Sequence, residues 1–143
     1  MKSLTQEQIR EISQQFDCGN CCYWNKKTGE LIFTPDFDEN IYAEKEFYEE
    51  ELDELENNWG DYVEIEKPHS KDNFEIMVNF AEHLDDSNQL KNKLFNAINK
   101  KKPFREFKFV VDNSGKYRQQ WFDFKSSQLE KWVVERFNEI PTE

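Results

Sequence analysis

Three cysteines near the N-terminus are the side chains best suited to metal or redox chemistry. Cys18, Cys21 and Cys22 form a C-x-x-C spacing with one additional thiol. This spacing supplies half of a typical zinc site, which needs about four ligands. No second C-x-x-C follows, and His69 and His83, the only histidines, are 14 residues apart. We therefore predict no bound metal and no cofactor.

A redox role for the same cysteines is also disfavoured. A thioredoxin-like C-x-x-C opens a helix directly after a strand. Here the thiols instead precede a predicted β-hairpin. We expect reduced cysteines, of which one or two pack in the core.

The usual arrangements for nucleophilic or acid–base catalysis are missing from the sequence. It has no Gly-x-Ser-x-Gly, no glycine-rich phosphate loop and only four glycines. His83 lies near Glu75, Glu82, Asp85 and Asp86 along helical sequence. Acids at such positions suit helix starts and exposed faces. We predict no catalytic residues and no enzymatic activity.

Basic and aromatic residues of the C-terminal half form the candidate binding surface. Cations beside an exposed ring suit a nucleic-acid backbone and an unstacked base. Trp121 and Phe122 cannot both lie on a buried stripe, because adjacent helical positions point about 100° apart. The alternative is that the rings are core and the cations pair with an acidic helix. The predicted surface comprises Arg105, Lys108, Arg118, Trp121, Phe122 and Lys125.

Charge is divided unequally along the chain. The net charge is −11, yet residues 1–90 hold 7 Lys/Arg against 23 Asp/Glu, and residues 91–143 hold 12 against 7. Residues 36–66, here called the acidic segment, contain 14 acids and a single base, Lys45. The two halves therefore either partly neutralise each other or present surfaces of opposite charge.

The C-terminal half is predicted to be helical. Its apolar residues recur every three or four positions, the spacing of a helix with one buried face. In the third helix Phe104, Phe107, Val110 and Val111 form this stripe. The predicted helices cover residues 72–84, 87–102, 103–113 and 117–140.

Helix start signals accompany these segments. Asp72 followed by Glu75, and Ser127 followed by Glu130, have the spacing of a capping box. Pro103 suits the first turn of a helix, where its missing N–H is not needed.

The N-terminal half is predicted to contain a short helix, a hairpin and one further strand. Thr5 and Gln8 form a capping box before a helix over 6–15. The runs CCYWN and ELIFT flank KKTG and predict a β-hairpin, with Cys22 and Trp24 on one face. The alternating YVEIE run predicts a third strand.

The acidic segment is predicted to hold an amphipathic helix between the hairpin and the third strand. Its apolar residues keep helical spacing and would face the core, with the acids outward. They are Ile41, Tyr42, Tyr48, Leu52, Leu55 and Trp59.

Four stretches of this sequence resemble a bacterial family, Uncharacterised Protein Family 0158. They are YWNKKTGELIF, YVEIEKPHSKDNFEIMVNFAEHL, PFREFKFVV and QQWFDFKSSQLEKWVVERFNEI. The resemblance covers most of the chain and implies the family's fold. The family has no established activity, so the resemblance implies no catalytic residue.

These observations predict an α+β fold, in which a mostly helical C-terminal half packs with a small antiparallel N-terminal sheet. We expect one domain over 1–143, with the helix, hairpin, acidic helix and strand in 1–68 and the helical body in 69–143. No run of 18 apolar residues and no N-terminal apolar h-region is present. A cytoplasmic protein without membrane association is therefore expected.

For function, we predict a non-catalytic binding module that acts through a protein partner. One alternative is RNA or DNA binding through the basic aromatic C-terminal helices, which would weaken steeply with salt. Another is that the acidic segment, with a charge balance of −13, mimics a nucleic-acid backbone and occupies a basic partner.

Overall fold

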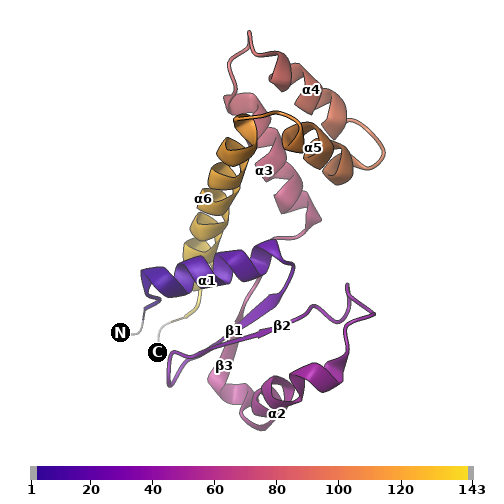
Figure 1. Ribbon diagram of the computed structural model, residues 1–143. Helices are drawn as coiled ribbons and strands as arrows, with labels where there is room; N and C mark the ends of the chain where they lie inside the picture. Colours follow the sequence, from indigo (N-terminus) through magenta and orange to yellow (C-terminus); the bar gives the residue numbers. More distant parts are fainter. Residues whose placement is uncertain (1–2, 142–143) are drawn as a thin grey trace. The chain divides into compact units, whose positions relative to one another are not determined.

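The computed structural model describes residues 3–141 and has the predicted α+β fold (Figure 1). A three-stranded antiparallel sheet lies near the N-terminus, and helices make up the C-terminal half. The elements in chain order are α1 (Gln6–Asp17), β1 (Cys21–Asn25), β2 (Leu31–Thr34), η1 (Lys45–Tyr48), α2 (Glu49–Asn57), η2 (Trp59–Asp61), β3 (Tyr62–Ile65), α3 (Ser70–His83), α4 (Gln89–Ile98), α5 (Pro103–Asp112) and α6 (Tyr117–Asn138), where η denotes a 3₁₀ helix.

The chain forms two compact units. The N-terminal unit comprises Met1–Lys67 and Leu129–Glu143, and the helical unit comprises Pro68–Gln128. Residues of α6 belong to both units. Folding as one domain over 1–143 stays a prediction.

The sheet has the strand order β2-β1-β3. Asn25 accepts hydrogen bonds from the backbone N–H groups of Lys27 and Thr28 through its side chain, which holds the tight turn before β2. Gly29 in this turn has φ of 78°, a conformation that glycine adopts without steric cost. The third strand pairs with β1 instead of extending the sheet beyond β2, so the hairpin's first strand is central.

One face of the sheet carries the core of the N-terminal unit. Trp24 pairs with Leu31 and Cys22 with Phe33, so these four side chains share a face, and the prediction that Cys22 and Trp24 lie on one face is confirmed. The helix α1 and the C-terminal part of α6 cover this face, and the Thr5 capping box that begins α1 is confirmed. The buried cluster consists of Ile12, Phe16, Cys22, Trp24, Ile65 and Val133.

The helix predicted for the acidic segment is shorter than its apolar spacing suggested. The continuous helical stretch runs over residues 45–57, a separate 3₁₀ turn follows at Trp59–Asp61, and Leu55 is the buried apolar residue of α2. Ile41 and Tyr42 precede the helix and are exposed, and Trp59 follows it and is also exposed. The prediction that these three face the core is wrong.

The core of the helical unit is built around Trp121. Its ring packs edge-on against Phe80 and Phe107, with centroids 5.3 Å and 4.8 Å away. Aliphatic residues of α4 and α5, among them Leu94 and Val111, complete this core. Phe104 was predicted to share the buried stripe of α5 but is 44% exposed.

Two predicted helix starts are wrong. The helix α3 begins at Ser70, and Asp72 accepts a hydrogen bond from the backbone N–H of His69 as its third residue, so it is not the cap itself. Ser127 lies inside the continuous α6 and begins no helix. Pro103 does occupy the first turn of α5, as predicted.

Removal of a buried side chain should destabilise the N-terminal unit. We expect Ile12→Ala to lower the free energy of unfolding by about 2–5 kcal/mol, because Ile12 is fully buried and its truncation leaves a cavity. The matched control, Ile41→Ala, removes an exposed side chain and should change it by less than about 0.5 kcal/mol. Urea unfolding followed by circular dichroism measures both. Equal effects would contradict this core assignment.

Candidate functional site

The two aromatic residues of the predicted surface lie in different environments. Trp121 is 8% exposed and belongs to the core of the helical unit. Phe122 is partly exposed, and the guanidinium of Arg118 lies 4.7 Å from its ring centroid. The expectation that these neighbours cannot both be buried is met, and Trp121 is the buried one.

The cations of the predicted surface interact within the helical unit. Arg118 pairs with Asp112 at 3.3 Å. Arg105 pairs with Glu106 at 3.5 Å. The Lys125 ammonium lies 5.9 Å from the Trp121 ring centroid. Lys108 is exposed.

The exposed rings of the helical unit lie on α5 instead. Phe109 is 68% exposed and Phe104 is 44% exposed, and both lie beside Arg105 and Lys108 along the helix. The spacing of apolar residues along α5 could not predict that these two rings are exposed, because apolar residues occupy more than one face of this helix. The sequence predicts exposed aromatic rings beside cations at Trp121 and Phe122. Rings of this kind thus occur on α5.

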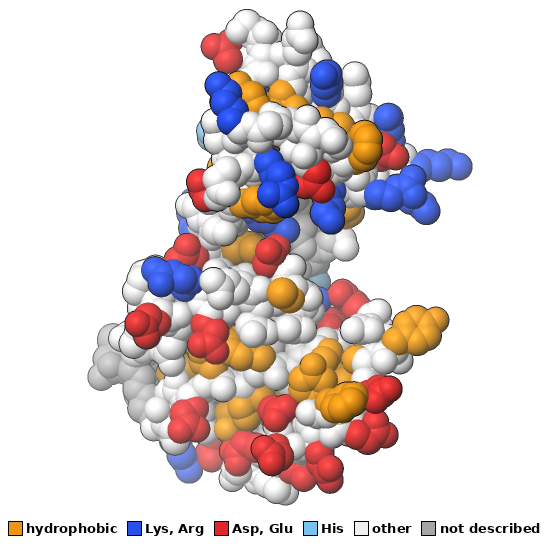
Figure 2. All heavy atoms as spheres, viewed as in Figure 1, with side chains coloured by type: hydrophobic (Ala, Val, Ile, Leu, Met, Phe, Trp, Pro, Cys, Tyr) orange, Lys and Arg blue, Asp and Glu red, His pale blue; other side chains and the backbone are white. Residues whose placement is uncertain are grey.

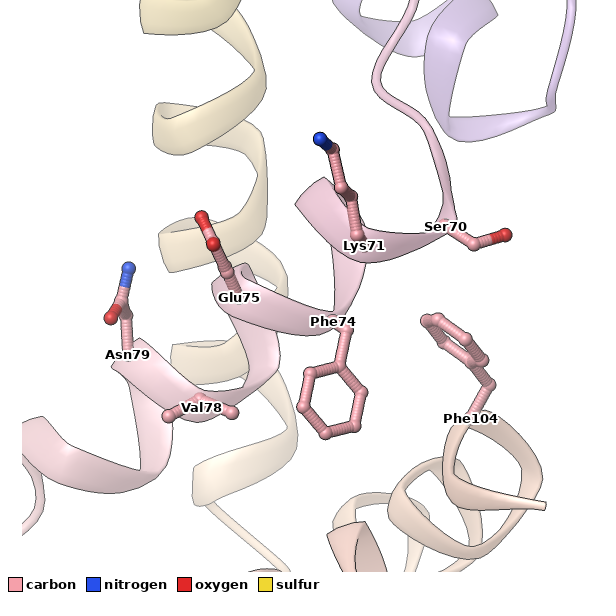
Figure 3. Close-up of a pocket in the computed structure, with 7 residues that line it drawn as sticks. All are labelled: Ser70, Lys71, Phe74, Glu75, Val78, Asn79 and Phe104. Carbon is pink, nitrogen blue, oxygen red and sulfur yellow. The ribbon is translucent and has the colours of Figure 1, made fainter. Parts of the chain in front are cut away.

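An open groove adjoins the N-terminal end of α5. It has a volume of about 600 Å³. Figure 3 shows the Phe74 and Phe104 rings turned toward one another, with Lys71 and Glu75 extending from α3 away from them. The two ring centroids are 6.5 Å apart at an interplanar angle of 76°. The lining residues are Ser70, Lys71, Phe74, Glu75, Val78, Asn79 and Phe104.

The acidic segment also exposes large apolar side chains. Tyr42 is 89% exposed, Phe47 77%, Ile41 74% and Trp59 61%. Figure 2 shows acidic and hydrophobic side chains next to one another on the visible face of the N-terminal unit. Among residues 3–141, these four and the two α5 rings make up six of the seven large hydrophobic residues that are exposed. Exposed apolar side chains therefore concentrate on two short segments of opposite charge.

Contacts to the outer face of the sheet position this segment. The Trp59 ring lies 6.2 Å from that of Tyr23 on β1. The Tyr62 hydroxyl donates to a Glu54 carboxylate oxygen at 2.8 Å, which connects β3 to α2. The Leu55 side chain is buried. These contacts hold α2 in place while the residues at both of its ends stay in solvent.

The charge asymmetry seen in the sequence is also present between the two units. The N-terminal unit has 8 Lys/Arg against 22 Asp/Glu, a balance of −14. The helical unit has 11 against 8, a balance of +3. The N-terminal unit thus exposes apolar side chains and carries a net negative charge, whereas the helical unit exposes apolar side chains and carries a net positive charge.

Comparison with protein families identifies the relatives of this chain. The model of the Uncharacterised protein family (UPF0158) matches residues 5–141. The chain belongs to this family. Comparison of this UPF0158 protein with curated proteins and with solved structures gave no match.

Neither a cluster of metal-binding side chains nor a membrane-spanning helix occurs in the part of the UPF0158 protein that the structure describes. Within residues 3–141, no three His, Cys, Asp or Glu side chains are grouped so that they could hold a metal ion. None of the helices in this range is both long and apolar enough to span a bilayer.

A group of ion pairs lies next to the end of β3 in the N-terminal unit of the UPF0158 protein. The Lys67 ammonium lies 3.2 Å from an Asp36 carboxylate oxygen and 2.9 Å from one of Glu39. Burial opposes the charge of Asp36, but hydrogen bonds from Lys67 and from the backbone of Glu39 and Asp38 hold its pKa below the ordinary value. Burial likewise opposes the Lys67 charge, yet the two carboxylates raise its pKa. The network fastens the acidic segment to the end of β3.

The three cysteines of the UPF0158 protein are free thiols in different surroundings. Cys18 is exposed and Cys22 is buried in the core. Burial, together with the nearby carboxylates of Asp36 and Glu64, raises the pKa of Cys21 to about 11. Burial also raises the pKa of Cys22. Neither Cys21 nor Cys22 therefore has the lowered pKa of a reactive thiol.

Alkylation should follow this order of exposure. At about pH 8, iodoacetamide should modify Cys18 at least tenfold faster than Cys21 and Cys22, because the thiolate is the reacting form. Mass spectrometry of peptides from a timed reaction measures the three rates. In urea all three rates should become similar. Equal rates in the folded protein would contradict the environments described.

The Asp36–Lys67 pair should make stability depend on acid pH. Because the pKa of Asp36 is lowered on folding, its contribution is present above the unfolded value of 3.8 and is lost as pH falls through the folded value. Asp36→Asn should therefore be less stable than the parent chain at pH 7, with the difference shrinking toward about pH 2. Asp38→Asn, which changes a neighbouring exposed side chain, is the control. A difference that is the same at both pH values in urea unfolding would contradict the pair.

Proposed function

We propose that this UPF0158 protein is a non-catalytic binding module whose acidic segment docks a protein with a basic surface. The observation that carries the proposal is the exposure of Ile41, Tyr42, Phe47 and Trp59, which lie 61–89% in solvent. Burying side chains of this size on a partner is worth about 1.5–3 kcal/mol each. Interfaces typically depend on a handful of such anchors.

The negative charge of the acidic segment indicates that the partner is basic. The acidic segment holds 14 acids and one base, so it attracts a basic surface and accelerates the encounter. Carboxylates around the anchors also disfavour acidic partners. The proposed partner therefore combines Lys or Arg side chains with pockets that accept aromatic rings.

The exposed rings distinguish this proposal from nucleic-acid mimicry. A mimic presents carboxylates in place of phosphates and needs no apolar anchor, so aromatic substitutions would leave its binding unchanged. In docking of the proposed kind, the rings contribute most of the affinity and the acids mainly the association rate. Effects of aromatic and acidic substitutions therefore separate the two.

Affinity purification from the native cell tests the proposal. We expect the tagged chain to recover a basic protein in a nuclease-resistant manner. Phe47→Ser combined with Tyr42→Ser should abolish the recovery, because it removes two anchors without touching a carboxylate or the contact of Trp59 with the sheet. The partner is then made recombinantly, and its affinity for the parent and variant chains is measured by calorimetry.

The matched control is Phe109→Ser, which removes an exposed ring from the helical unit. It should leave the recovery of the partner intact. Recovery of the same proteins by the variant at Phe47 and Tyr42 would contradict docking through these rings. Loss of recovery only on substitution of Glu49, Glu50 and Glu51 would favour mimicry instead.

A further inference from the structure

The helical unit has an independent surface that the proposed function does not use. We propose that α5 and the adjoining groove bind single-stranded nucleic acid, with a base stacked on an exposed phenylalanine and phosphates held by the cations beside it. This site lies in Pro68–Gln128, whereas the acidic segment lies in the N-terminal unit. The inference therefore does not rest on the proposed protein partner.

The first argument is charge. Residues 91–125 contain 10 Lys/Arg and 3 Asp/Glu, although the whole chain is strongly acidic. Figure 2 shows basic side chains gathered around the visible parts of α4 and α5. Phosphate contacts by such cations provide most of the affinity for a nucleic-acid backbone.

The two acids of α5 are already engaged. Glu106 lies 3.7 Å from the Lys100 ammonium and 3.5 Å from the Arg105 guanidinium. Asp112 pairs with Arg118. The remaining exposed cations include Lys101, Lys102 and Lys108.

The second argument is the exposure of the rings. Phe109 and Phe104 are exposed residues of α5, and Lys108 lies between them along the chain. A core-forming role does not explain them, since Phe107 and Val111 fill the core from the same helix. Exposed rings in a basic surface are the stacking platforms that single strands use.

The third argument is the groove. Because the Phe74 and Phe104 rings are inclined at 76°, a flat base can stack on one ring and meet the edge of the other. The groove is open to solvent, so a base can approach the two rings. Paired bases inside a duplex cannot reach such a site, so single strands should bind in preference to duplexes.

Fluorescence anisotropy with a labelled single-stranded RNA of about 12 nucleotides tests the site. The full chain should bind at about 50 mM salt and release the RNA as salt rises. Phe109→Ala should weaken binding by about 5- to 150-fold, the effect of one lost stack. Arg105→Gln combined with Lys108→Gln should reduce the slope of log affinity against log salt by about 1.4.

Controls separate this site from the rest of the molecule. Phe47→Ala removes a ring of similar exposure from the acidic segment and should leave RNA binding unchanged. Circular dichroism should show that all variants keep the parent's unfolding midpoint to within a small shift, because the substituted side chains are exposed.

Three outcomes would overturn the inference. The first is absence of binding at low salt. The second is equal affinity for parent and Phe109→Ala, or for single strands and duplexes of the same sequence. The third is binding of poly-glutamate with the Phe109 dependence expected of RNA while RNA itself does not bind, which would assign the surface to an acidic polypeptide.

Discussion

Burial of a few large apolar side chains is the interaction on which this structure depends. Hydrophobic residues make up only 36% of the chain, yet 13 of its residues are phenylalanine. Each unit has a small core of its own, around Trp24 and Ile12 in one and around Trp121 and Phe107 in the other. The chain has few apolar side chains to bury, yet six large ones on two short segments stay in solvent. The stability of the fold does not explain this exposure.

Local signals in the sequence were sufficient to predict most of the helices and strands. The hairpin, its facing residues, the third strand and the Thr5 cap follow from alternation, turn residues and capping chemistry, all of which act within a few residues. The start of α3 was misplaced because Asp72 fits both the cap and the third helical position. The order of the strands depends on which edge of β1 is covered, a tertiary property that alternation does not encode.

The candidate surfaces were harder to predict, for one physical reason. Helical spacing reports that apolar residues share a face, but not whether another element covers that face. Trp121 was placed on the binding surface and is core, whereas Phe104, Ile41 and Trp59 were placed in the core and are exposed. Charge was the more reliable signal, because the acidic segment lies in the N-terminal unit, whereas the basic residues of α4, of α5 and of α6 before Leu129 lie in the helical unit. The two binding proposals follow from combining that charge division with the observed exposure.

The central claim is that the rings of the acidic segment are uncovered in the free chain and covered by a protein partner in the cell. Site-specific photocrosslinking in the native cell, with benzoylphenylalanine in place of Phe47, tests this most directly. The account predicts one discrete crosslinked protein from this position and none from Thr28, an exposed residue of the hairpin turn. No crosslinked product at Phe47, or the same products from both positions, would contradict it.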